Sequence, residues 1–198
     1  MAEGLGKSEV AAELTDSLKR AAAALEAQGI PYLLGGGLGC WARGGPPSSN
    51  DIDFMLKPED AERAQEALAE AGMRPANPPE HWLLKAWDGD ILIDLIFEPS
   101  GMRIDDEVIA RGDEISVMAM HMRVMNLNDI LITKLHALDE HSADYGDLIL
   151  ITRSLREQID WGRIREATSA SPFARAFFAL ADGLEICPPE SAPAPIET

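Results

Sequence analysis

The sequence predicts an α/β (α+β) protein, with a mixed β-sheet flanked by helices and a helical C-terminal region. Short apolar runs alternate with helical apolar spacing in the first half, Asp88-Gly89 is typical of a hairpin turn, and the last third carries only helical patterns. We expect a core domain over residues 1–125, a helical region over 126–186 packed on it, and a disordered tail over 187–198, where four prolines occur among few apolar residues.

Glycine and proline residues divide the first half into helices and strands. Ser8 and Gly29 bound the first predicted helix, and Pro58 and Gly72 bound a later one. The predicted elements are, in order, a helix over 8–29, a strand over 30–34, a helix over 38–43, a strand from 51, a helix over 58–71, a loop over 75–79, and strands over 81–87 and 91–97.

The second half begins with a methionine-rich segment, residues 115–125, which predicts one or two strands. We assign its alternating methionines to the core rather than to a metal site. Asn126 is expected to cap a helix ending near Leu138, with Asp129 favourably placed in its first turn. Three further helices are predicted over 145–157, 161–168 and 172–184.

Composition limits the partners. Seventeen Lys and Arg face 34 Asp and Glu, giving a formal charge of -17, which repels DNA. An RNA such as tRNA would need a local basic surface, whereas a cationic acceptor would be attracted to an acidic cleft. Cys40 and Cys187 give no disulfide framework, and no apolar run is long enough to span a membrane, so we expect a cytoplasmic protein with no membrane partner.

Three aspartates stand out against apolar surroundings. Asp51 and Asp53 are separated by one residue on a predicted strand, so both side chains point to the same face, while Asp94 lies within an apolar strand. Carboxylates are the ligands that Mg²⁺ prefers, and three from neighbouring strands suit a two-metal site. The alternative is an exposed strand end plus a buried acid with its own partner.

A glycine turn precedes these acids. Gly35, Gly36 and Gly37 follow the apolar Leu33-Leu34, and their missing side chains let a phosphate approach the backbone at a helix N-terminus. No Gly-Lys-Ser/Thr follows, so this is not a Walker A loop, and the spacing does not fit the dinucleotide fingerprint. The alternative is a tight strand-to-helix turn without a ligand.

This pattern resembles the minimal nucleotidyltransferase domain of the DNA polymerase β superfamily, over about residues 30–155. The segments 132–138 and 144–148 are similar to bacterial branches that include abortive-infection type toxins and antibiotic nucleotidyltransferases. The resemblance implies a nucleotidyltransferase fold and two Mg²⁺ ions held by Asp51, Asp53 and Asp94. It also implies that Gly35 and Gly36 seat the triphosphate, and that the acid nearest the acceptor helps to activate its hydroxyl.

Two departures and one lysine bear on the nucleotide site. The glycine pair fits either 35–36 or 36–37. Related branches often carry an Arg and a Thr shortly before the first aspartate; here Ser48 or Ser49 stands in for the Thr as the hydroxyl donor to phosphate, and no Arg lies adjacent. Lys134 lies on the apolar side of its predicted helix and is expected to contact a triphosphate oxygen, as in related enzymes. The alternative is a surface lysine paired with a helix acid.

The predicted function is magnesium-dependent transfer of a nucleoside monophosphate from a nucleoside triphosphate, such as ATP, to a hydroxyl on a small molecule. Two alternatives remain: a toxin-like enzyme that acts on tRNA and has an antitoxin-like protein partner, and a non-catalytic descendant that binds a nucleotide or a protein. The sequence carries neither a histidine metal site nor a serine-hydrolase elbow.

Overall fold

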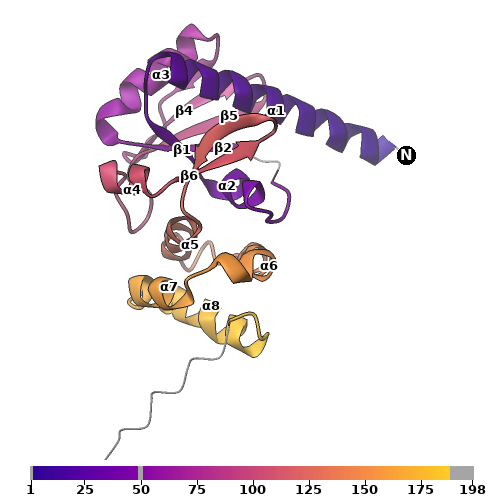
Figure 1. The fold of residues 1–198 in the computed structure, drawn as a ribbon, viewed down its shortest axis with the longest axis vertical. Helices are drawn as coiled ribbons and strands as arrows, with labels where there is room; N and C mark the ends of the chain where they lie inside the picture. Colours follow the sequence, from indigo (N-terminus) through magenta and orange to yellow (C-terminus); the bar gives the residue numbers. More distant parts are fainter. Residues whose placement is uncertain (1, 49–50, 188–198) are drawn as a thin grey trace, which may run out of the picture.

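The computed structural model describes residues 2–48 and 51–187, in which a seven-stranded sheet lies between two layers of helices (Figure 1). Apart from Cys187, the tail predicted over 187–198 lies outside the described residues. Within the described ranges, no helix has the length and apolar character needed to cross a lipid bilayer.

The sheet is mixed, as the sequence predicts. Its strands are β1 (Tyr32–Leu34), β2 (Asp51–Leu56), β3 (Arg74–Ala76), β4 (Leu83–Asp88), β5 (Ile91–Ile96), β6 (Asp113–Val117) and β7 (Met120–Val124). They lie in the order β3-β4-β5-β2-β1-β7-β6. The pairs β2–β5 and β1–β7 are parallel, and the other neighbours are antiparallel.

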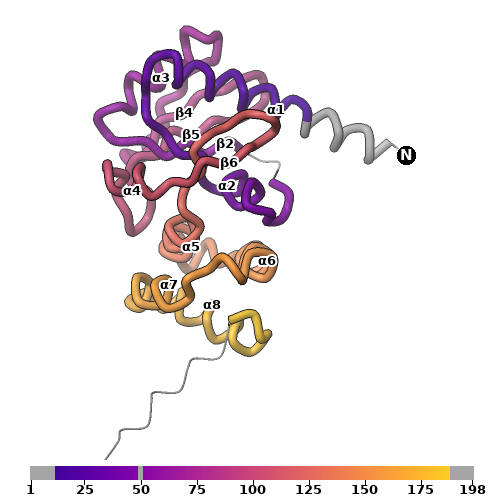
Figure 2. The backbone as a smooth tube through the Cα atoms, viewed as in Figure 1, coloured from indigo at the N-terminus to yellow at the C-terminus, as the bar shows by residue number. Residues whose placement is uncertain are grey.

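The helices cover both faces of this sheet. They are α1 (Ala2–Ala27), α2 (Gly36–Ala42), α3 (Ala61–Glu70), α4 (Asp106–Ala110), α5 (Leu127–His136), α6 (Tyr145–Leu155), α7 (Trp161–Thr168) and α8 (Pro172–Gly183), with short 3₁₀ turns η1 (Pro58–Asp60) and η2 (Arg156–Gln158). Figure 2 shows α1 and α3 together on one side of the sheet, and α5 to α8 gathered on the other.

Two hydrophobic clusters follow from the alternation of side chains along the strands. Leu34, Ile52 and Phe54 pack in the cluster under α1 and α3. Leu33 and Met55 point the other way, into a cluster that continues through α2, α5 and the C-terminal helices. Because this second cluster contains side chains from both the sheet and the helical region, the two parts share one core, and a division at residue 125 stays a prediction.

Two elements differ from the expectation. β3 takes in part of the predicted loop, and its Pro75 is tolerated because an edge strand does not need every backbone N–H for pairing. The second difference is the five-residue α4, which was not among the predicted elements. It follows Asp105, whose side chain accepts a hydrogen bond from the Val108 amide. The methionine-rich segment forms two strands, joined by a turn in which Met118 and Ala119 have φ of 50° and 64°.

Candidate active site

Asp51, Asp53 and Asp94 meet on one face of the sheet where β2 pairs with β5. Asp53 lies directly opposite Asp94 in the parallel register, and one carboxylate oxygen from each of the three lies within 4.8 Å of the others. Ile52 and Phe54, which alternate with the acids, are fully buried on the opposite face. The fold thus brings the three acids of the sequence pattern into one cluster.

Burial and the negative charges of the neighbouring carboxylates disfavour ionisation of Asp53. Burial, followed by the charges of Asp51 and Asp94, raises the pKa of Asp53 from 3.8 to about 7, although Lys134 and Lys85 act in the opposite direction. Burial also raises the pKa of Asp94. Because like charges this close oppose ionisation of one another, a divalent cation is a fitting partner for the donor set.

Lys85 is a site residue that the sequence reasoning missed. Its Nζ lies 2.8 Å from an Asp94 carboxylate oxygen, and the interaction lowers the pKa of Asp94 against the effect of burial. The sequence predicted the hairpin but set its turn at Asp88-Gly89. In the structure Asp88 pairs with Ile91, so the turn is Gly89-Asp90, and this register places Lys85 opposite Asp94. Lys85 therefore favours an ionised Asp94 carboxylate in a buried position.

The glycine turn lies against the carboxylates. The Gly35 amide donates to the Asp53 carbonyl oxygen at 2.8 Å, and Gly36 has φ of +53°. A Cβ at Gly36 would overlap the Asp53 carboxylate, and one at Gly37 would overlap the Ser48 side chain. Gly36 is thus required both by its backbone conformation and by contact with an acid. Ser49 lies outside the described residues.

Lys134 of α5 is half-buried and close to the site. Its charge lowers the pKa of Asp53, and also that of the Cys40 thiol, which burial raises to about 11. Among the described residues, the salt bridges do not include Lys134, so its predicted alternative, a pair with a helix acid, has no support there. Asp144, at the start of the segment 144–148, caps α6, with its side chain accepting from the Gly146 and Asp147 amides.

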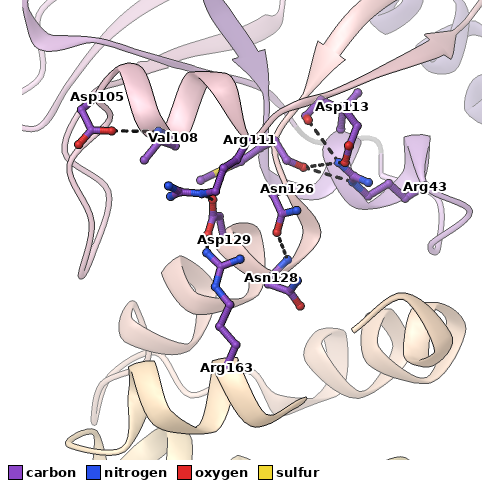
Figure 3. Close-up of polar contacts among 11 residues, drawn as sticks. Arg43, Asp105, Val108, Arg111, Asp113, Asn126, Asn128, Asp129 and Arg163 are labelled. Carbon is purple, nitrogen blue, oxygen red and sulfur yellow. Dashed lines mark hydrogen bonds and ion pairs between the residues drawn. The ribbon is translucent and has the colours of Figure 1, made fainter. Parts of the chain in front are cut away.

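The end of α2 is tied to the junction between β7 and α5, as Figure 3 shows. Arg43, the C-cap of α2, donates from Nη2 to the Met125 carbonyl oxygen at 2.8 Å and to an Asp113 carboxylate oxygen at 2.7 Å. The same Met125 carbonyl oxygen also accepts a hydrogen bond from Arg43 Nε at 3.2 Å. These bonds hold the helix that carries the glycine turn against the start of the helix that carries Lys134.

Asp129 fixes α5 from its other side (Figure 3). Its side chain is fully buried between two arginines, accepting from Arg111 Nε at 3.1 Å and from Arg163 Nη2. Arg111 lies between α4 and β6, and Arg163 lies in α7. Asp129, which the sequence placed in the first turn of a helix, therefore links α5 through buried ion pairs to α7 and to the segment between α4 and β6.

The comparisons with known proteins confirm the resemblance to nucleotidyltransferases found in the sequence. Residues 7–184 match the family described as uncharacterised nucleotidyltransferase, and the chain belongs to that family. It is therefore an enzyme of the nucleotidyltransferase class. A search of curated proteins by sequence finds no match.

Solved structures show the same fold. The crystal structure of ANT(2'')-Ia in complex with adenylyl-2''-tobramycin has a TM-score of 0.60 and 16% identity, covering 84% of this chain and 97% of that one. The lincomycin-bound lincosamide antibiotic adenylyltransferase LnuA has a TM-score of 0.51 and 14% identity, covering 69% of this chain and 94% of that one. At such identities the likeness establishes the architecture.

Proposed function

We propose that this protein is a magnesium-dependent nucleotidyltransferase that transfers a nucleoside monophosphate, such as AMP from ATP, to a hydroxyl on a small-molecule acceptor. The observation that carries the proposal is the convergence of three carboxylates within 4.8 Å, on strands next to a glycine turn that contacts one of them. Family membership supports the reaction class.

The carboxylates supply a donor set that fits a hard divalent cation. Asp51, Asp53 and Asp94 would hold two Mg²⁺ ions, since each offers a carboxylate oxygen within 4.8 Å of the others. When bound, Mg²⁺ lowers the pKa of the attacking hydroxyl and offsets charge on the attacking and leaving oxygens.

The triphosphate is assigned to the side of the glycine turn. Gly35 and Gly36 leave the backbone accessible to phosphate oxygens, and Ser48 lies beside the turn with a hydroxyl that can donate. Ser49 is assigned the same donor role from the sequence alone. The half-buried Lys134 supplies a positive charge on this side, near Asp53.

Asp94 is assigned the role of accepting the acceptor's proton. The acceptor oxygen forms a bond to the α-phosphorus, the bond from that phosphorus to the bridging oxygen breaks, and pyrophosphate leaves with that oxygen. Lys85 favours the ionised carboxylate that this role requires, since its ammonium lies 2.8 Å from Asp94.

A small molecule is the proposed acceptor. ANT(2'')-Ia was solved with an adenylylated aminoglycoside and LnuA with lincomycin, which supports a compound of comparable size here. The formal charge of -17 disfavours tRNA. The two free, buried cysteines, Cys40 and Cys187, agree with the reducing cytoplasm as the expected compartment.

The test is a transfer assay with each α-labelled nucleoside triphosphate, Mg²⁺, and either an aminoglycoside and lincosamide panel or total tRNA. We expect label on a small molecule, lost on chelation of Mg²⁺ and in Asp51→Asn and Asp53→Asn. Asp90→Asn, which removes an exposed carboxylate from the β4–β5 turn, is the matched control and should retain transfer. Full activity in both active-site variants, or label on tRNA alone, would contradict the proposal.

A further inference from the structure

Two rows of side chains cross four neighbouring strands on the face that carries the acids. Residues paired in register point to the same face of a sheet. The first row, from β2 to β3, consists of Asp53, Asp94, Lys85 and Ala76. The second row, in the same order, consists of Asp51, Leu92, Trp87 and Arg74. An apolar pair therefore continues directly from an active-site carboxylate toward the sheet edge.

Within the described residues, this part of the face is only partly covered. The main helix contacts of β3 and β4 are with α3, which lies on the opposite face. There Ala86, Ile91 and Ile93 are buried, whereas Trp87 and Leu92 are only half-buried. Among the described residues, neither Trp87 nor Leu92 belongs to the two hydrophobic clusters. Trp87 and Leu92 therefore present a partly exposed apolar surface beside the acids, which is suited to packing against a ligand.

The order of the strands gives the reaction a direction, on the basis of the proposed function. In an in-line displacement, the attacking oxygen and the departing pyrophosphate lie on opposite sides of the phosphorus. The glycine turn follows β1 and places the phosphates on the β1 side of the acids. The acceptor must therefore approach from β5 and β4, which is the side that carries Leu92 and Trp87.

We propose that Trp87 and Leu92 form an acceptor platform, on which a small molecule packs the apolar face of a saturated ring while its hydroxyl reaches Asp94. Strands lie about 4.8 Å apart, so the indole sits roughly one ring's width from the Asp94 strand. Arg74 supports the indole from the edge strand, with its guanidinium carbon 5.8 Å from the ring centroid.

The charges around the platform select a neutral or cationic ring over a polyanion. The ammonium of Lys85 is bound to Asp94, and the guanidinium of Arg74 is stacked on Trp87. Glu80 adds a negative charge close enough to raise the pKa of Asp94. A phosphate-rich acceptor such as RNA would meet repulsion here, while a sugar-like ring offers C–H groups to the indole and hydroxyls to the acids.

The experiment uses tobramycin and lincomycin as acceptors with Mg²⁺ and ATP, and measures KM for acceptor and ATP separately. Trp87→Ala should raise the acceptor KM about tenfold or more and leave the ATP KM within about twofold, because the lost contact is made by the acceptor alone. Trp87→Phe should restore most of the affinity. Trp82→Ala, at a 42% exposed position outside both rows, is the matched control and should change neither.

Leu92→Gln provides a second variant on the neighbouring strand and keeps the test open if Trp87→Ala fails to fold. Unchanged acceptor KM in a folded Trp87 or Leu92 variant would overturn the platform. Pyrophosphate release by the wild type without label on either ring compound would overturn it too, while leaving the proposed chemistry standing. Failure of the wild type to bind Mg²⁺-ATP or release pyrophosphate would instead contradict the proposed function, and this inference with it.

Discussion

Asp53 on β2 lies directly opposite Asp94 on β5, although 40 residues of chain separate them. The parallel pairing of two central strands places the two carboxylates about one strand spacing apart, near 4.8 Å, on one face. Lys85 on the third strand of the row is bound to Asp94 but not to Asp53. The two acids therefore have different surroundings, since among the described residues only Asp94 has an ammonium as a direct partner.

Mg²⁺ should stabilise the protein through these acids. Scanning calorimetry should show a higher Tm with Mg²⁺, equivalent to about 2.7 kcal/mol when its concentration is a hundred times Kd. In Asp53→Asn the increase should disappear, because one of the three ligands is lost. Asp90→Asn serves as the control with the same change of charge, and an equal Mg²⁺ effect in the two variants would count against the metal site.

The metal-free protein should lose stability as the pH rises toward 7. The pKa of Asp53 is about 7 in the folded protein and near 3.8 when unperturbed, so between these values the folded state binds the proton more tightly than the unfolded state. Stability from this group is therefore complete below about pH 4 and falls as the pH rises. Asp53→Asn removes the effect, and in EDTA its Tm advantage over the wild type should be larger at about pH 8 than at about pH 4.

Gly36→Ala should disturb the site as well as the fold. A left-handed backbone costs a residue with a Cβ about 1–2 kcal/mol, and here the added methyl also meets the Asp53 carboxylate. Gly72→Ala is the matched control, since Gly72 has φ of +91° and open space around its Cβ position. Both variants should unfold at lower urea concentration, but only Gly36→Ala should lose the Mg²⁺ effect on Tm. Loss of that effect in both would point to general destabilisation.

Asp129→Ala should be strongly destabilising. The substitution leaves Arg111 and Arg163 without their shared carboxylate and opens a space in a fully buried position. Breaking a buried ion pair costs about 3–5 kcal/mol, which urea unfolding can measure. Arg163→Gln should cost less, because that side chain is 37% exposed and Arg111 still pairs with Asp129. A loss below about 1 kcal/mol in Asp129→Ala would show that the cluster contributes little.

The sequence predicted the parts that depend on local patterns. The alternation around Asp51 and Asp53 set their common face, and the Asp-Gly pair predicted the β4–β5 hairpin, although its turn lies one residue later, at Gly89-Asp90. Asn126 caps α5 as expected, with its side chain accepting from the Asn128 amide. In each case the information lies within a few residues of the element concerned.

The remaining features depend on partners far along the chain. The sequence places Asp129 only as a favourable acid in a first helical turn. The packing of α4 and α7 shows that Arg111 and Arg163 enclose it. Arg43 likewise finds its acceptors 70 or more residues away, at Asp113 and Met125. β3 was missed because Pro75 disfavours a strand everywhere except at an edge, and edge position is a property of the folded sheet.

Because Cys40 is buried within α2, the labelling rate of its thiol can serve as a probe of local opening of that helix. Since the thiol is fully covered and burial raises its pKa to about 11, labelling of Cys40 should require α2 to move away from its packed position. In a Cys187→Ser background, the labelling rate of Cys40 would report how often α2 opens, and a nucleotide bound at the proposed glycine-turn site should slow labelling in the absence of acceptor.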